Sequence, residues 1–229
     1  RFRYIEKWGA SLLNTAYPKL EIIDLVPNHV KRVLEVGCSA GATGLEIKNR
    51  YSCELYGIEE NQQLASISAQ FYQKVEIGSS KEMVFTYPEE FFDLIILDNI
   101  LQLQEDPWKY IDELKKLLAP SGSIICRVPN VSHGEVLFQL LNGQWNYMHA
   151  GILNKDHLRF FTPQTINTLF PSTDYEIVTH RNEKINVDFN IKLFIEEVVH
   201  LAHSFGIELN QLTTNLEIYQ MLLLVRKIK

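Results

Sequence analysis

The chain has 229 residues, 46% of them apolar, which suits a single domain over residues 1–229 rather than two full domains. Its net charge of −6 argues against a nucleic-acid partner, because such binding depends on clustered Lys and Arg. Three scattered cysteines predict a reducing, cytoplasmic compartment without disulfides. Neither a secretory leader nor an apolar run of 18 residues is visible, so we expect no membrane partner.

Residues 1–30 form a predicted N-terminal helical cap, with helices over 4–13 and 18–25. From residue 33 onward short apolar strands alternate with helices, and Phe92–Leu97 is apolar almost throughout. Such strands are typical of a parallel sheet covered on both faces. The pattern predicts a doubly wound, Rossmann-like α/β fold. The expected strands are 33–37, 54–59, 73–77, 92–98 and 122–129, and the expected helices are 41–50, 61–71 and 107–118.

The helix over 107–118 has the clearest boundaries. Asp106-Pro107 supplies an N-cap and a proline at the first helical position, and Pro120-Ser-Gly122 predicts its end. Thr162-Pro163 repeats the first signal and predicts a helix to about residue 170. A strand over 174–182, a helix over 190–205 and a final strand over 217–227 follow. Residues 130–161 lie between these parts as an insertion after the fifth strand, and we expect it to be a substrate lid.

The most informative segment is Val33-Leu-Glu-Val-Gly-Cys-Ser-Ala-Gly41. It reads as a strand that ends in a turn of small residues, where a helix begins. Glycine lets a ligand approach backbone amides, and the following helix adds its positive dipole end. Glu59 comes about 20 positions later at the end of the second strand, where a carboxylate can accept hydrogen bonds from ribose hydroxyls. A dinucleotide frame requires three glycines, but here it reads Gly37, Ser39 and Ala42. The pattern therefore predicts a nucleoside without a pyrophosphate.

The Glu-x-Gly-x-x-x-Gly turn resembles motif I of class I S-adenosylmethionine-dependent methyltransferases. Gly57-Ile-Glu59, Phe92–Asn99, Leu117–Gly122 and Ile124–Asn130 extend the resemblance over roughly residues 15–229. It implies a seven-stranded sheet closed by an antiparallel hairpin, S-adenosylmethionine as cofactor, and an N-terminal segment that covers it. Pro129–His133 and Gly151–Thr162 are similar to a bacterial subgroup often found beside glycosyltransferase and cell-surface polysaccharide genes.

Carried over by position, the resemblance also implies the residues that bind the cofactor. Relatives usually have an acidic residue after the glycine of strand three, where this chain has Ser79 and Ser80. After strand four, relatives often have Leu-Glu-His, where this chain has Leu101-Gln-Leu103. These departures keep a non-catalytic binding protein open as an alternative. The predicted cofactor residues are Tyr17, Glu35, Gly37, Cys38, Ser39, Gly41, Glu59, Glu60, Ser79, Ser80 and Asn99.

Methyl transfer needs a base only if the acceptor loses a proton, and His133 and His157 are the candidates. Either histidine could instead be structural, by capping a helix or anchoring the lid. We expect Asn130, Trp145, Tyr147 and Arg159 to contact the substrate, with Arg159 suited to an anion. An internal ion pair for Arg159 and a small lid core for the aromatic residues are the competing interpretations. The spacing of His133, His149 and His157 matches no metal site.

The sequence therefore predicts methyl transfer from S-adenosylmethionine to a small-molecule or sugar acceptor, at oxygen or nitrogen. A homodimer is compatible with this prediction. Two other functions stay open: a regulator that binds the cofactor without turnover, and a nicotinamide-dependent oxidoreductase, which Ser39 and Glu35 disfavour. The acceptor itself is not predicted, because one fold serves many acceptors.

Overall fold

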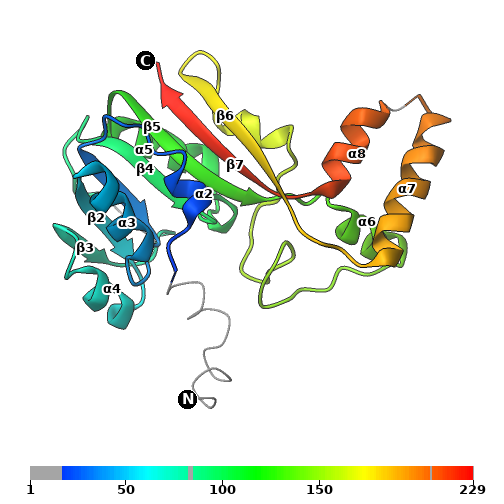
Figure 1. Cartoon of the computed structure of the whole chain (residues 1–229), viewed down its shortest axis with the longest axis horizontal. Coiled ribbons are helices and arrows are strands. Elements are labelled where there is room, and N and C mark those ends of the chain that lie inside the picture. The colour runs from blue at the N-terminus through cyan, green and yellow to red at the C-terminus, as the bar shows by residue number, and fades with distance from the viewer. Residues whose placement is uncertain (1–16, 82–84, 207, 229) are drawn as a thin grey trace.

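A seven-stranded sheet forms the centre of the protein in a computed structural model that describes residues 17–81, 85–206 and 208–228 (Figure 1). The strand order is β3-β2-β1-β4-β5-β7-β6, and β7 runs antiparallel to both of its neighbours. This confirms the predicted doubly wound sheet with a terminal antiparallel hairpin. The strands are β1 (Arg32–Val36), β2 (Glu54–Glu59), β3 (Lys74–Ile77), β4 (Phe92–Asp98), β5 (Leu118–Pro129), β6 (Tyr175–Lys184) and β7 (Ile218–Lys227).

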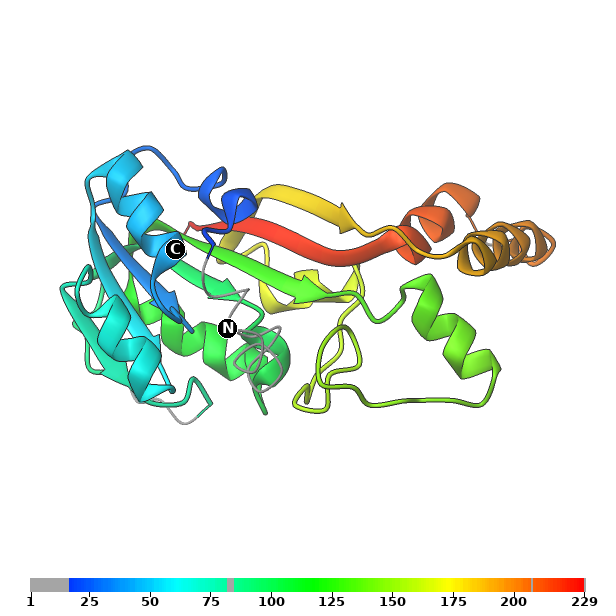
Figure 2. The same ribbon diagram turned by 60° about the horizontal axis from the view of Figure 1, so that its bottom comes forward.

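Two apolar cores pack on the sheet, which is why the central strands are buried on both faces. One core joins β4 and β5 to α5 (Pro107–Leu117) and the short 3-10 helix η2 (Thr165–Leu169). The other joins β1 and β2 to α2 (Leu20–Ile23) and α3 (Ala42–Tyr51). Helix α4 (Gln62–Ser68) connects β2 to β3, and the 3-10 helix η1 (Leu101–Leu103) follows β4. Figure 2 shows α2 and α3 on the opposite side of the sheet from α5.

The capping signals explain where α5 begins, and the helix ends within one residue of its predicted end, but β5 begins earlier than the predicted residue 122. The Asp106 carboxylate accepts a hydrogen bond from the Lys109 amide at 3.0 Å, with Pro107 at the first helical position. The helix ends at Leu117, and β5 begins at once, so Pro120-Ser-Gly122 lies inside the strand rather than before it. The register between β4 and β5 shifts there, between Phe92 and Leu94, which accommodates the extra residues.

Several other expected helices are shorter than predicted. The second helix of the N-terminal segment, α2, is a single turn. Helix α4 stops at Ser68 instead of residue 71. The helix expected from Thr162 to residue 170 is only the short η2. Pro171 disfavours helical geometry at Phe170, the residue before it, so the last expected turn does not form. The helix predicted over 4–13 lies outside the described residues.

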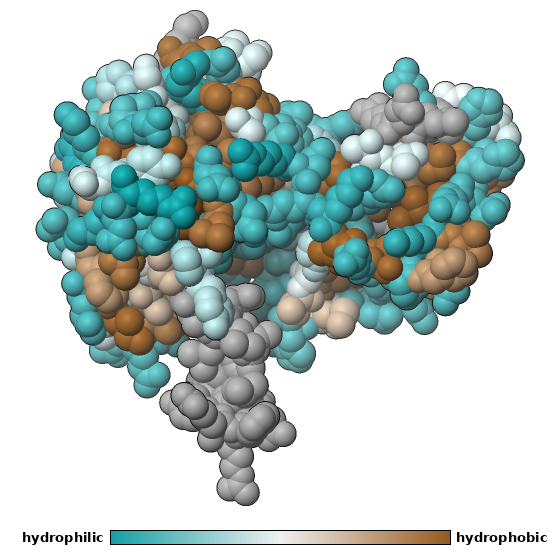
Figure 3. Space-filling view, viewed as in Figure 1, coloured by the Kyte–Doolittle hydropathy of each residue, from teal (hydrophilic) through white to brown (hydrophobic). Residues whose placement is uncertain are grey.

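Two helices that were not predicted, α6 (Gly134–Leu141) and α8 (Leu209–Glu217), pack with α7 (Phe189–His203). We call these three helices the helical lobe. Strands β6 and β7 extend from the sheet to the lobe (Figures 1 and 2), whose small core centres on Ile191, Ile195 and Leu216. The space-filling view shows the sheet domain and the lobe as two masses joined by a narrower region (Figure 3). The lobe is therefore a separately packed part of the chain at the far end of β6 and β7.

Candidate functional site

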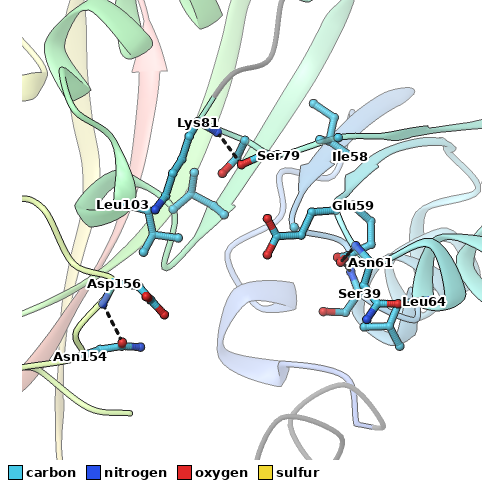
Figure 4. A pocket seen from close by; sticks show the side chains of 15 residues that line it. Ser39, Ile58, Glu59, Asn61, Leu64, Ser79, Lys81, Leu103, Asn154 and Asp156 are labelled. Carbon is cyan, nitrogen blue, oxygen red and sulfur yellow. Dashed lines mark hydrogen bonds between the residues drawn. The ribbon is translucent and has the colours of Figure 1, made fainter. Parts of the chain in front are cut away.

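A cavity of about 580 Å³ lies at the carboxyl ends of β1, β2 and β3. We call it the cofactor cavity. Glu59, Asn61 and Ser39 lie on one side of it, and Asn154 and Asp156 lie on the other (Figure 4). Open α/β sheets bind ligands at this edge. The lining residues are Gly37, Ser39, Ile58, Glu59, Glu60, Asn61, Leu64, Gly78, Ser79, Ser80, Lys81, Ile100, Leu103, Asn154 and Asp156.

The turn between β1 and α3 forms one wall through unusual backbone geometry. Gly37, Ser39 and Gly41 all have positive φ angles, of 73°, 50° and 82°. A side chain at Gly37 would be strained, and its Cβ would lie 3.1 Å from Ile100 Cδ1. Gly41 is the N-cap of α3, so the positive end of that helix lies next to the turn. The wall therefore presents bare backbone where a ligand can approach closely.

The carboxylate of Glu59 is fixed by the backbone rather than by side chains. One oxygen accepts a hydrogen bond from the Ser39 amide at 2.8 Å, and the other accepts one from the Asn61 amide at 2.9 Å. The residue is 7% exposed, yet it lines the cavity. Each carboxylate oxygen can accept a second hydrogen bond. Glu59 is thus oriented to receive two neighbouring hydroxyl groups, as a ribose ring presents them.

Apolar side chains and the predicted lid complete the cavity. Ile58, Leu64, Ile100 and Leu103 supply apolar surface of the kind that a flat base requires. Asn154 and Asp156 come from residues 130–161 and lie across from Glu59. The chain that carries them is tied to the loop after β4, because the amides of residues 158 and 159 both donate to the Gln102 carbonyl, at 2.8 and 3.1 Å. The insertion therefore contacts the cofactor cavity in this conformation.

A compartment of only about 10 Å³ adjoins the turn on its other side, next to Tyr17, Lys19, Glu35 and Thr43. The Lys19 ammonium forms an ion pair with Asp98 at the end of β4, which restricts this space. Asp98 also pairs with Arg127, whose Nε lies 3.0 Å from Oδ1.

Glu35 lies beneath the turn as an almost fully buried acid. It accepts a hydrogen bond from the Tyr72 hydroxyl. Burial raises its pKa from 4.5 to about 7, while the hydrogen bond from Tyr72 and the charge of Lys19 act in the opposite direction. Tyr72 reaches Glu35 across Gly44, where a Cβ would lie 2.0 Å from the tyrosine oxygen. Through Tyr72, Glu35 thus holds the turn against the core that joins β1 and β2 to α2 and α3.

Comparisons with known proteins agree with this geometry. A family model described as a methyltransferase domain matches residues 8–180. The chain belongs to this methyltransferase family. Among solved structures, a SAM-dependent methyltransferase from Archaeoglobus fulgidus superposes with a TM-score of 0.62 and 18% identity over 99% of this chain and 98% of that one. The [4+2]-cyclase SpnF shares the fold at a TM-score of 0.55 and 18% identity, over 90% and 80% of the two chains.

Curated relatives are more similar in sequence but are only partly covered. A ubiquinone biosynthesis O-methyltransferase from Psychrobacter cryohalolentis is 24% identical over 70% of this chain and 63% of its own length. An ajmaline N-methyltransferase from Rauvolfia serpentina is 27% identical over 42% of this chain and 35% of its own. The chain thus spans less than two thirds of either relative. The family and the fold establish S-adenosylmethionine as the cofactor, and the cavity fits it through Glu59 and the glycine turn.

The structure brings most of the predicted cofactor residues of this methyltransferase together. Gly37, Ser39, Glu59, Glu60, Ser79 and Ser80 line the cofactor cavity, and Tyr17, Glu35 and Cys38 line the small compartment beside it. Gly41 and Asn99 line neither. Asn99 has a φ of 59°, and its side chain contacts Asp98 and Gln102. Contact of Gly41 and Asn99 with the cofactor stays a prediction. Gly41 does form part of the turn between β1 and α3.

The two histidines predicted as bases occupy different places. His133 is fully buried at the N-cap of α6, where Nδ1 accepts from the Glu135 amide at 3.4 Å, and it does not line the cofactor cavity. His157 contacts the Ile152 carbonyl through Nδ1 at 2.9 Å, next to the lid residues of the cavity. Burial lowers the pKa of His157, so its ring is neutral near pH 7. With Nδ1 as the donor, Nε2 carries the lone pair that a base needs.

The predicted substrate residues are scattered. Asn130 is fully buried, and its amide group is used completely: Nδ2 donates to the carbonyls of residues 215 and 218, both at 2.7 Å, and Oδ1 accepts from the Ser132 amide and hydroxyl. It has no hydrogen-bonding group left for a substrate. Trp145 packs edge-to-face against Phe160, with ring centroids 5.5 Å apart. Tyr147 and Arg159 are exposed, and Arg159 donates to a neighbouring carbonyl.

Several cavity residues were missed by sequence reasoning. Ile58, Leu64 and Ile100 follow the same apolar pattern as core residues, so no sequence signal separates them from the core. Asn154 and Asp156 reach the cavity only because the insertion folds back over the sheet. Gly78 and Lys81 were detectable, because they flank the serines that were predicted. No group of three or more potential metal ligands gathers anywhere in the described residues.

No helix within the described parts of the chain is both long and apolar enough to cross a membrane.

Proposed function

We propose that this methyltransferase transfers a methyl group from S-adenosylmethionine to an oxygen or nitrogen atom of a small-molecule acceptor. The observation that carries the proposal is the Glu59 carboxylate, held by two backbone amides in the wall of a cavity of about 580 Å³. When bound, the sulfonium cofactor supplies an already activated methyl group. The protein then has to orient the acceptor and exclude water, and positioning alone can contribute about 7–11 kcal/mol to lowering the barrier.

The insertion over residues 130–161 is the part of the chain that we propose closes over the acceptor. Asn154 and Asp156 line the cavity from this segment, and the Gln102 carbonyl holds the segment to the loop after β4. His157 follows them directly. It would remove a proton through Nε2 when the acceptor is an alcohol or a phenol. An amine acceptor that is already neutral needs no such base.

The relatives support both kinds of acceptor. One is named as an O-methyltransferase of ubiquinone biosynthesis and one as an N-methyltransferase of ajmaline, and each aligns with less than three quarters of this chain. We therefore propose the acceptor atom as oxygen or nitrogen, with sugars, phenols and amines as the classes to test.

A cofactor-binding protein without methyl transfer is the second candidate. Ser79 offers a hydroxyl where relatives usually have an acidic residue, and the same fold occurs in a protein named as a [4+2]-cyclase. Calorimetry with S-adenosylmethionine, S-adenosylhomocysteine and NAD tests the cofactor. Binding of NAD with no binding of either sulfur compound would refute the proposal.

Turnover requires a separate measurement. We expect S-adenosylhomocysteine to accumulate in the presence of S-adenosylmethionine and at least one acceptor from a panel of sugars, phenols and amines. Tight cofactor binding with no product across the panel would favour the non-catalytic alternative. His157→Asn is the matched variant, because its amide can still donate to the Ile152 carbonyl but has no lone pair at the Nε2 position. With an alcohol acceptor kcat should fall by about 10²–10⁴, and cofactor affinity should be unchanged.

A further inference from the structure

A cavity of about 320 Å³ lies between α6, residues 148–153 of the insertion and the first residues of β7. We call it the insertion cavity. It shares no lining residue with the cofactor cavity, so an inference drawn from it goes beyond methyl transfer. Its volume is within the range of small-molecule sites, about 300–1,000 Å³. The lining residues are Glu135, Val136, Gln139, Met148, Ala150, Gly151, Ile152, Leu153, Ile185 and Tyr219.

Glu135 is the one charged residue in this lining, and its carboxylate has no cation beside it. Its side chain is 39% exposed, so a ligand can reach it. Within the described parts of the chain, the basic group that lies within 4 Å of this carboxylate is His133, with Nδ1 3.9 Å from Oε2. Burial lowers the pKa of His133 to about 4, so the ring is neutral near pH 7 and supplies no charge.

The surroundings of Glu135 reinforce the preference for a positive charge. Burial raises the pKa of Glu135, and the charge of Asp188 at the start of α7 raises it further. Such a shift indicates a negative charge that a bound cation would stabilise. Lys184 precedes the lining residue Ile185, but its ammonium forms an ion pair with Glu217. The cavity therefore favours a cation over an anion.

Tyr219 adds a second polar group that a ligand can reach. Its hydroxyl makes no hydrogen bond to another described residue, and it is not one of the buried polar atoms without a partner, as the hydroxyls of Tyr110 and Tyr175 are. A Cβ on Gly151 would lie 3.2 Å from the Tyr219 oxygen, so this oxygen lies beside the insertion. Burial and, after it, the charge of Glu135 raise the pKa of Tyr219, which shows that the two groups are close enough to interact.

The rest of the lining is mainly apolar. Val136, Ile152 and Leu153 form one small core, and Met148 and Ile185 extend the apolar surface toward solvent. Such a surface can enclose a hydrocarbon group, while one carboxylate and one hydroxyl fix a single polar end.

We propose that the insertion cavity binds a small organic amine, whose ammonium group donates hydrogen bonds to the Glu135 carboxylate and to the Tyr219 hydroxyl oxygen. A primary ammonium group has three donors, so one ligand can contact both residues. The hydrocarbon part of the amine packs on the apolar lining. Hydrogen bonds between an ammonium and a carboxylate are stronger than those between neutral groups, which makes the charge of Glu135 the main source of selectivity.

Nuclear magnetic resonance on the ¹⁵N-labelled full chain tests this proposal. The probes are cyclohexylammonium, cyclohexanol and cyclohexanecarboxylate, which share one ring and differ in charge. We expect cyclohexylammonium to shift the amide resonances of residues 150–153 in a saturable way. Cyclohexanol should bind at least about fivefold more weakly, and the carboxylate more weakly still. Equal binding of the three probes, or shifts confined to residues of the cofactor cavity, would overturn the proposal.

Charge variants locate the bound amine. Glu135→Gln keeps the shape of the side chain and should weaken cyclohexylammonium binding by about 5- to 30-fold, with little change for cyclohexanol. Tyr219→Phe should weaken it by about 3- to 10-fold. Asp156→Asn is the matched control, because it removes a charge from the insertion but lines only the cofactor cavity. Binding that Glu135→Gln leaves unchanged, or that Asp156→Asn reduces equally, would refute the site.

Ala150→Leu tests the cavity itself rather than its charge. Ala150 lines the cavity from its exposed rim, and a larger side chain there should weaken all three probes by at least about tenfold. Unchanged cyclohexylammonium binding in this variant would show that the amine binds outside the cavity.

The same samples keep this inference separate from the proposed methyl transfer. The variants at Glu135, Tyr219 and Ala150 should bind S-adenosylhomocysteine as the wild type does, because none of these residues lines the cofactor cavity, and retained binding shows that they are folded. Wild-type protein that binds cyclohexylammonium at residues 150–153 but no S-adenosylhomocysteine would refute the proposed function and leave the insertion site standing. The reverse result would refute only the insertion site.

Discussion

Glu59→Gln is the sharpest perturbation of the cofactor cavity, because it preserves size and removes charge. Each oxygen of Glu59 accepts a backbone N–H, from Ser39 and from Asn61. In the variant one of these two amides faces an NH₂ group and loses its acceptor, which should cost about 1–3 kcal/mol of folding stability. Hydrogen bonds from a ribose to a carboxylate contribute about 1.5–3 kcal/mol each, against about 0.5–1.5 kcal/mol for a neutral acceptor. Cofactor affinity should therefore fall by about 1–2 kcal/mol, or roughly 5- to 30-fold.

Two measurements on the same samples distinguish these effects. Calorimetry with S-adenosylhomocysteine gives the loss in affinity, and urea unfolding gives the loss in stability. Glu54→Gln is the matched control, because Glu54 begins the same strand but is exposed at its opposite end, where it accepts from the Tyr56 hydroxyl at 3.1 Å. The control should change neither cofactor affinity nor, beyond about 0.5 kcal/mol, stability.

The reasoning fails if Glu59→Gln loses stability but binds S-adenosylhomocysteine as tightly as the wild type. In that case Glu59 serves only to order the turn through Ser39 and Asn61, and the ribose is held elsewhere. An equal loss of affinity in Glu54→Gln would also contradict it, because the effect would then not be specific to the cavity.

Three further outcomes are expected. Gly44→Ala should destabilise the fold by more than about 2 kcal/mol in urea unfolding, because its Cβ would lie 2.0 Å from the Tyr72 oxygen; an effect below 0.5 kcal/mol would disprove the close packing. Asn130→Ala should cost about 2–4 kcal/mol through its lost hydrogen bonds, whereas Asn154→Ala should cost little, and equal costs would contradict the structural role of Asn130. Burial raises the pKa of Glu35 to about 7, so the folded protein retains a proton that the unfolded chain releases, and stability should fall as pH rises from about 4.5 to 7, on the order of 3 kcal/mol in total. Glu35→Gln should remove this slope, and an unchanged slope would assign it to other groups.

The cofactor half of the site was predictable because it is local in sequence. Gly37 and Ser39 lie in the turn after β1 and Glu59 ends β2, and the spacing of these residues predicted both the turn and a carboxylate in the wall of the cavity. Parallel strands that follow one another end at the same edge of the sheet, so position along the chain predicts position in space. The same reasoning predicted the order of elements through β5.

Helix α7 of the helical lobe was predicted, but α6 and α8 were not, because their stability comes from tertiary packing. Helix α6 begins at Gly134, where a Cβ would lie 2.6 Å from Ile195 of α7, so the two helices require each other. Helix α8 has no side-chain cap and depends on contacts such as Leu216 with Ile191 and Ile195. Capping and periodicity carry no information about such contacts. The early start of β5 was missed for a related reason, since Pro120-Ser-Gly122 marks the end of α5 but carries no signal that Leu118 already pairs with Phe92 of β4.

Asn130 and His133 show how far residue type can mislead about function. Both follow the carboxyl end of β5, where substrate contacts are expected, and both are fully buried. Asn130 donates from Nδ2 to the carbonyls of residues 215 and 218 and accepts from Ser132 at Oδ1, whereas His133 leaves one nitrogen without a partner among the described residues. The distinction depends on complete hydrogen-bond accounting, which needs coordinates.

In the proposed site, the acceptor is recognised by segments that are distant in sequence. Lys81 and Leu103 follow β3 and β4, whereas Asn154 and Asp156 belong to the insertion, and these residues share one cavity only because the Gln102 carbonyl holds the insertion in place. The proposed ribose contact depends on none of these residues. We therefore expect substitutions at 154 and 156 to change the acceptor while Glu59 and the glycine turn keep the cofactor. This separation is a physical reason why one fold can serve O-methylation, N-methylation and unrelated chemistry. It also explains why the sequence predicts the cofactor but not the acceptor.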